Sequence, residues 1–226
     1  TGYNFVKFFG IAKWHYRSLA KWLKIIQIFS LFCFLFMCYF MMQLELKVIL
    51  WLSVFAVITF LYAIPLLPKR YYLDSSHNLR DISGLKVYII GLVWAGVTVI
   101  LPLMNNDIVL NADVIITAIQ RFIFVVALML PFEIRDLAFD NFKLATIPQK
   151  IGVKQTKIMG LLLIMLFLFL EFFKAEVVAI NFIVLTIVTL ITTGFIVFSK
   201  ANNSTYYSAF WVESIPIMWL LITVFG

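Results

Sequence analysis

Charged residues are scarce in this chain, and their scarcity excludes an ordinary soluble domain. Asp, Glu, Lys and Arg make up 13% of the 226 residues, whereas soluble domains average about 25%. The two cysteines and two histidines argue against a metal centre built from those ligands. The sequence also lacks a P-loop, a nucleophile elbow and the HExxH pattern of zinc proteases. The sequence therefore gives no indication of a P-loop nucleotide-binding protein, an α/β-hydrolase or a zinc protease.

Hydrophobic residues, in contrast, are abundant and continue to the end of the chain. They form 64% of the residues, and the mean hydropathy is +1.04. About seven segments approach the roughly 20 residues that cross a bilayer. They are residues 24–44, 47–67, 86–104, 112–133, 157–173, 176–198 and 208–226. Because these segments are apolar on all sides and do not alternate, we predict an all-α polytopic membrane protein with a single domain, residues 1–226.

Basic residues gather in every second loop. The basic stretches are residues 7–24, 69–86 and 135–157, and the loops between them, at 44–47, 105–107 and 173–176, carry few bases. The positive-inside rule assigns basic loops to the cytoplasm, so we expect an inner (plasma) membrane protein of a bacterium with these loops inside. The net charge of +7 is interpreted as this topology signal and not as a nucleic-acid-binding surface.

Residues 1–9 are largely apolar and run directly into the first basic stretch. We expect them to be the tail of an additional, partial N-terminal helix that begins before Thr1. The alternative is a short helix that lies on the membrane surface.

Three carboxylates follow the fourth predicted span. Glu133, Asp136 and Asp140 are spaced i, i+3 and i+7, which places them on one helical side, here called the acidic face. Carboxylates near hydrocarbon usually point into a bundle interior or a watery cavity. Two aspartates one turn apart offer oxygen ligands for Mg²⁺ and leave coordination positions for diphosphate oxygens. The alternative interpretation is ordinary ion pairing with Arg135 and the nearby lysines.

The residues that follow extend this pattern. The run reads Ile134-Arg135-Asp136, then Asp140, Lys143, Thr146, Pro148 and Gly152. It resembles the second Asp-rich motif of the UbiA superfamily of intramembrane prenyltransferases, which is approximately I-R-D-x-x-x-D, a basic residue, T-x-P and a glycine. Residues 63–102 are similar to the family's third and fourth helices with their cytoplasmic loop. Together the two similarities cover most of residues 50–155.

This resemblance implies a bundle of about nine transmembrane helices with a cavity open to the cytoplasm. In the family, Mg²⁺ holds a prenyl diphosphate against the Asp-rich motifs while the prenyl group passes to an acceptor. Asp136 and Asp140 would then be the catalytic residues and the Mg²⁺ ligands. The implied substrate-binding residues are Lys143 and Glu133 beside the motif, and Lys69, Arg70 and Arg80 in the preceding loop, which would neutralise the leaving group.

The family's first Asp-rich motif is incomplete here. Its matching region is residues 1–7, where Asn4 stands for the motif's asparagine, but no aspartate follows at the required spacing. Asp74, Asn78 and Asp81 either help to replace the lost motif or are solvated loop residues with helix caps. Two functions remain open: a prenyltransferase that modifies an aromatic or lipid acceptor, and a catalytically silent membrane subunit or lipid-binding protein. A small transporter is a weaker third option.

Arg121 lies near the middle of the fourth span. A charge at this depth is costly and marks a pairing or functional position. We expect either an ion pair, with Glu171 or Glu213 as the candidate partner, or a substrate-binding role in the lining of a cavity.

Overall fold

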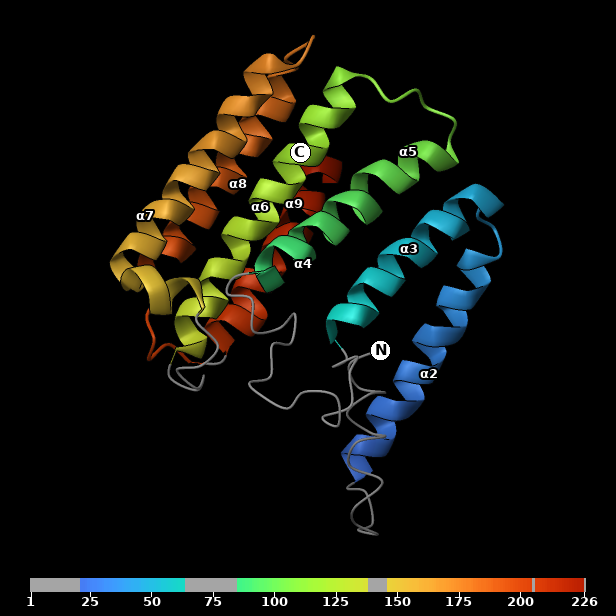
Figure 1. Ribbon diagram of the computed structural model, residues 1–226, viewed down its shortest axis with the longest axis horizontal. Coiled ribbons are helices and arrows are strands. Elements are labelled where there is room, and N and C mark those ends of the chain that lie inside the picture. The colour runs from blue at the N-terminus through green and yellow to red at the C-terminus, as the bar shows by residue number, and fades with distance from the viewer. Residues whose placement is uncertain (1–20, 64–84, 138–145, 205, 226) are drawn as a thin grey trace, which may run out of the picture. The chain divides into compact units, whose positions relative to one another are not determined.

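The computed structural model describes residues 21–63, 85–137, 146–204 and 206–225 (Figure 1). The chain divides into two compact units, Thr1–Leu50 and Trp51–Gly226. The described residues are helical and contain no strand. The prediction of an all-α protein is therefore confirmed for these ranges.

The first unit contains α2 (Lys21–Met41) and the beginning of α3 (Leu46–Ala63), whose remainder belongs to the second unit. Both helices coincide with predicted spans, at 24–44 and 47–67. Their described apolar parts, Ile28–Met41 and Leu46–Thr59, are each between 10 and 17 residues long.

Among its described residues, the second unit contains five helices that are long and apolar enough to cross a membrane. They are α4 with η3 and α5 (Leu85–Asn105), α6 (Ala112–Asp136), α7 with η5 (Ile147–Phe173), α8 (Ala179–Phe198), and η6 with α9 (Tyr207–Phe225). This is an integral membrane protein with several spans. The total of seven spans and a UbiA-like bundle stay predictions.

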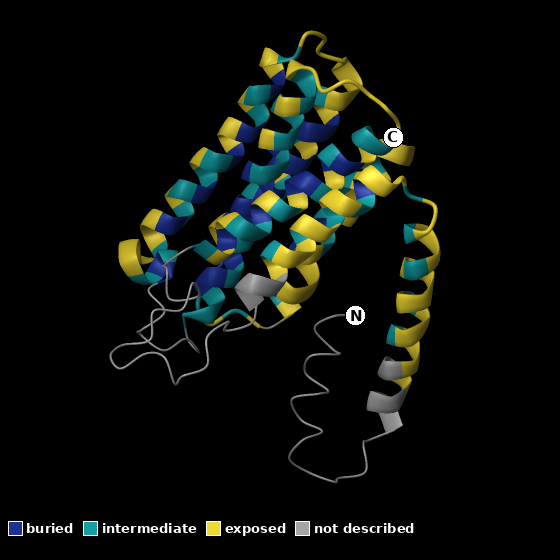
Figure 2. Ribbon diagram, turned by 45° about the vertical axis from the view of Figure 1, so that its right-hand side comes forward, coloured by how far each residue is buried: buried dark blue, intermediate teal, exposed yellow. Residues whose placement is uncertain are grey.

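Helix α6 is the central element of the second unit. It begins at an N-cap, where Asn111 Oδ1 accepts a hydrogen bond from the Val114 N–H at 3.0 Å, a partner for one of the free amides of the first turn. Buried residues run along α6, and the outward faces of its neighbours are exposed (Figure 2). Phe124 and Phe167 are fully buried, and their ring centroids lie 5.3 Å apart.

Helix α7 begins ten residues before the span predicted at 157–173. Thr146 is its N-cap, Pro148 lies in its first turn, and Gln149 Oε1 accepts a hydrogen bond from the Thr146 N–H at 2.9 Å. Gly152 then interrupts the helix with φ +81° and ψ 157°, a conformation that is essentially restricted to glycine. The polar first turn is therefore separated from the apolar span by a kink, which hydropathy alone does not reveal.

Candidate functional site

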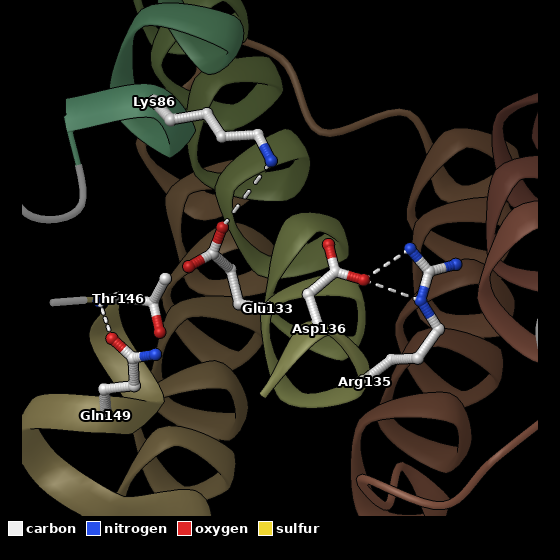
Figure 3. Close-up of polar contacts among 6 residues, drawn as sticks. All are labelled: Lys86, Glu133, Arg135, Asp136, Thr146 and Gln149. Carbon is white, nitrogen blue, oxygen red and sulfur yellow. Dashed lines mark hydrogen bonds and ion pairs between the residues drawn. The ribbon is translucent and has the colours of Figure 1, made fainter. Parts of the chain in front are cut away.

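The end of α6, the beginning of α7 and the beginning of α4 meet at one end of the second unit, here called the acidic end. Figure 3 shows Glu133 directed toward Lys86 of α4, and Asp136 directed toward the guanidinium of Arg135. The first turn of α7, with Thr146 and Gln149, lies beside them. The I-R-D pattern and the T-x-P pattern, which are separated along the chain, are therefore neighbours in space.

Glu133 is the most deeply buried carboxylate at this end, with 4% of its surface exposed. The Nζ atom of Lys86 lies 4.0 Å from Glu133 Oε1, and 47% of the lysine side chain is exposed. A buried carboxylate near hydrocarbon needs compensation, and the ammonium provides part of it. The Lys86 side chain thus remains about half exposed while its ammonium approaches Glu133.

Asp136 forms a close ion pair with its neighbour Arg135. The guanidinium donates from Nε at 2.8 Å and from Nη2 at 2.6 Å, and both bonds reach Asp136 Oδ1. Arg135 Nη1 donates to Ser208 Oγ of η6 at 2.7 Å, so the arginine also ties α6 to the beginning of the last span. Asp136 Oδ2 accepts no hydrogen bond from a described residue. The ion-pairing interpretation thus holds for Asp136, and one carboxylate oxygen stays available to a ligand.

The described part of the chain contains only some of the predicted site. Glu133, Asp136 and Arg121 are described. The other predicted site residues lie outside the described ranges: Asp140, Lys143, Lys69, Arg70, Arg80 and Asn4. Asp74, Asn78 and Asp81 lie outside them as well. Within the described ranges, no group of three His, Cys, Asp or Glu side chains is close enough to hold a metal ion. The carboxylate oxygen of Asp136 is a suitable donor for Mg²⁺, and the predicted second ligand, Asp140, is not among the residues searched.

The structure does not bring Arg121 to the acidic face. Arg121 and Asp136 are both on α6, and 15 residues of helix separate them, which is about 22 Å along the axis. Instead, Arg121 lines a cavity of about 320 Å³ near the other end of the helix. Its guanidinium carbon lies 4.1 Å from the ring centroid of Trp219, within the distance of a cation–π interaction.

Of the two alternatives for Arg121, the described residues provide no ion pair, and Arg121 does line a cavity. Its substrate-binding role stays a prediction. Arg121 has no ion pair with a described carboxylate. Glu171, one of its candidate partners, lines the same cavity but pairs with Lys174 Nζ at 2.7 Å and accepts from Gln120 Nε2 at 2.9 Å. The residues predicted from the sequence did not include Gln120, Lys174 or Trp219. Gln120 could have been found from the sequence, because it is a polar amide next to an arginine within an apolar span.

No protein-family model, no curated protein and no solved structure matches this chain.

Proposed function

We propose that this chain is a UbiA-like intramembrane prenyltransferase. In this proposal it transfers a prenyl group from a prenyl diphosphate to an aromatic or lipid acceptor, with the acidic end on the cytoplasmic side of a bacterial inner membrane. The supporting observation is the placement of Glu133 and Asp136 at the end of a membrane-spanning helix, beside the first turn of α7. Thr146 and Pro148 at that turn, and Gly152 at the kink that follows it, continue the family-like pattern.

The charges at the acidic end are consistent with a site that needs a cation. Lys86 and Arg135 carry two positive charges, and Glu133 and Asp136 carry two negative charges. The net charge of these four side chains is therefore zero, and by themselves they do not attract a diphosphate. Additional positive charge would come from Mg²⁺ or from the basic loop residues, in particular Lys143.

Asp136 and Asp140 are the residues that would hold Mg²⁺ in this proposal. When bound, the ion supplies charge neutralisation to the diphosphate as it leaves. Arg135 fixes the orientation of Asp136 through two hydrogen bonds to Oδ1, so that Oδ2 remains the ligand atom. The half-exposed side chain of Lys86 would supply an ammonium to a phosphate oxygen.

A catalytically silent UbiA-like subunit or lipid-binding protein is the second candidate. It is favoured by the engagement of Asp136 Oδ1 with Arg135, which is also how a purely structural carboxylate behaves. The incomplete first Asp-rich motif supports it further. In this case the chain would bind membrane lipid and a membrane-protein partner, and the acidic end would serve to hold the helices together.

Ligand-dependent thermal unfolding separates the two candidates. The full chain in detergent is heated with Mg²⁺, with a non-hydrolysable prenyl diphosphate, and with both. At about 100 times its dissociation constant, a ligand adds about 2.7 kcal/mol to the stability of the protein that binds it. We expect stabilisation that requires both components and is lost in Asp136→Ala and in Asp140→Ala.

Glu176→Ala is the matched control, because it also removes one carboxylate but is exposed in the loop between α7 and α8. It should keep the full stabilisation. Equal stabilisation of the wild type and Asp136→Ala would contradict the assignment of the metal ligands. No stabilisation of the wild type would favour the silent protein, and purification of a stable complex would then identify its partner.

A further inference from the structure

The Arg121 cavity lies within the membrane-spanning part of the molecule and away from the acidic end. Arg121 is nine residues from Ala112, the first residue of α6, which corresponds to about 14 Å of helix. The cavity of about 320 Å³ is lined by α6, the end of α7, α8 and α9. It is therefore a separate site, and its occupant does not depend on the proposed prenyl transfer.

The cavity has a net positive charge. Arg121 and Lys174 contribute two positive charges and Glu171 one negative charge, which leaves a single positive charge. Glu171 is 2% exposed, and its Oε2 atom contacts Lys174 and Gln120, whereas no ion pair joins it to Arg121. An arginine at this depth without a counter-ion is costly, and a bound anion would remove that cost.

The guanidinium of Arg121 donates no hydrogen bond to a described residue. One planar face covers Trp219, and the N–H groups of a guanidinium point outward in its own plane. The Nε atom is buried and has no hydrogen-bond partner among the described residues. Buried donors are almost always satisfied, so this N–H shows that the described residues do not fully satisfy the Arg121 guanidinium. Asn181, in the first turn of α8, adds an amide near the positive end of that helix.

The exposed lining of the cavity combines polar and apolar side chains. Leu220 and Thr223 of α9 and Asn181 of α8 are exposed, whereas Val184 and Leu185 of α8 form a buried apolar wall. Both α8 and α9 belong to helices that are long and apolar enough to span a membrane. An occupant that enters between them would have a charged group inside and an apolar body outside.

We propose that this cavity binds the singly charged oxyanion group of a membrane lipid. Arg121 and Lys174 contact the oxyanion, and Trp219 holds the guanidinium in place. Val184, Leu185 and Leu220 cover the adjoining apolar part. The single net positive charge matches a monoanion, which is either a phosphodiester headgroup or a fatty-acid carboxylate.

Native mass spectrometry of the full chain in detergent tests this proposal. Phosphatidylglycerol is compared with phosphatidylcholine of the same acyl chains, and oleate is compared with monoolein. We expect at least one anionic lipid to bind about tenfold more tightly than its counterpart without net charge. Phosphatidylglycerol selectivity would identify the phosphodiester as the ligand group, and oleate selectivity the carboxylate.

Three variants make the test specific. Arg121→Gln should abolish the selectivity. Glu171→Gln should increase it severalfold, because it raises the net charge of the cavity while Gln retains an acceptor for Gln120. Lys200→Gln removes the same charge as Arg121→Gln from an exposed position after α8 and should leave the selectivity unchanged. A purely structural Arg121 does not produce opposite effects in the first two variants.

Two results would overturn the proposal. One is a wild type without selectivity for either anionic lipid. The other is a Glu171→Gln variant that unfolds at the wild-type temperature but does not bind the anion more tightly. Because the second result uses a variant that keeps Arg121, the test does not depend on whether Arg121→Gln folds.

Discussion

Gly152 offers a direct test of the kink that joins the two parts of α7. Its φ of +81° and ψ of 157° lie in a region that residues with a Cβ rarely adopt. A Cβ added at this position meets no atom within 4 Å. The cost of Gly152→Ala is therefore expected to come from the backbone alone and not from a clash.

The magnitude follows from the strain of one residue in this region, about 1–3 kcal/mol. For a chain of this length, 1 kcal/mol corresponds to about 2–4 °C in Tm. Gly152→Ala should thus lower the Tm by about 2–12 °C. We expect the variant also to move the first turn of α7, because the Gly152 carbonyl accepts from Thr156 Oγ1 at 2.9 Å and would shift if the backbone relaxes.

Gly194→Ala is the matched control. Gly194 lies inside α8, and a Cβ there also meets nothing within 4 Å. Alanine is favoured over glycine in a helix by up to about 1 kcal/mol, so this variant should unfold at the same temperature or slightly higher. Both Tm values are measured by thermal unfolding of the full chain in detergent. A Gly152→Ala variant as stable as the wild type would refute the positive φ and the kink.

Two further variants test the packing and the buried polar contacts around α6, and both are measured in the same way. Phe167→Ala should destabilise the protein by up to about 3–5 kcal/mol, because Phe167 is fully buried and its ring contacts Phe124 and Trp219. In the control Phe169→Ala, where 56% of the residue is exposed, the stability should change by no more than about 0.5 kcal/mol. Equal losses of stability in the two variants would contradict this assignment of the core. Gln120→Leu should lower the stability by about 1–3 kcal/mol, because it removes the hydrogen bonds from Nε2 to Glu171 and to the Phe167 carbonyl. An unchanged stability would show that these two acceptors are satisfied without Gln120.

The sequence predicted the candidate site in part. The spacing of Glu133 and Asp136 indicated one helical face, and both residues do lie in the last turns of α6. The basic neighbours were harder to assign, because Lys86 lies 47 residues before Glu133 and Ser208 lies 73 residues after Arg135. Contacts over such separations depend on how the helices pack, and helical periodicity reports only on neighbours within one helix.

The position of Arg121 illustrates the same limit. Its depth in an apolar span indicated a pairing or functional position, but the sequence offered Glu171 and Glu213 as partners when its contact is the ring of Trp219. A carboxylate is the expected partner of a charge. An aromatic residue near the middle of another span gives no separate signal, because it is equally at home against lipid.

The sequence by itself determined the class of the protein and the extent of most spans, because both depend on how many consecutive residues are apolar. It also determined the local face on which the carboxylates lie, since that depends on spacing along one helix. Only the tertiary structure decided which sides of the helices are buried, that Lys86 approaches Glu133, and that Arg121 opens into a cavity. The physical reason is that lipid is as apolar as the protein core, so residues facing either environment look alike until the helices are packed together.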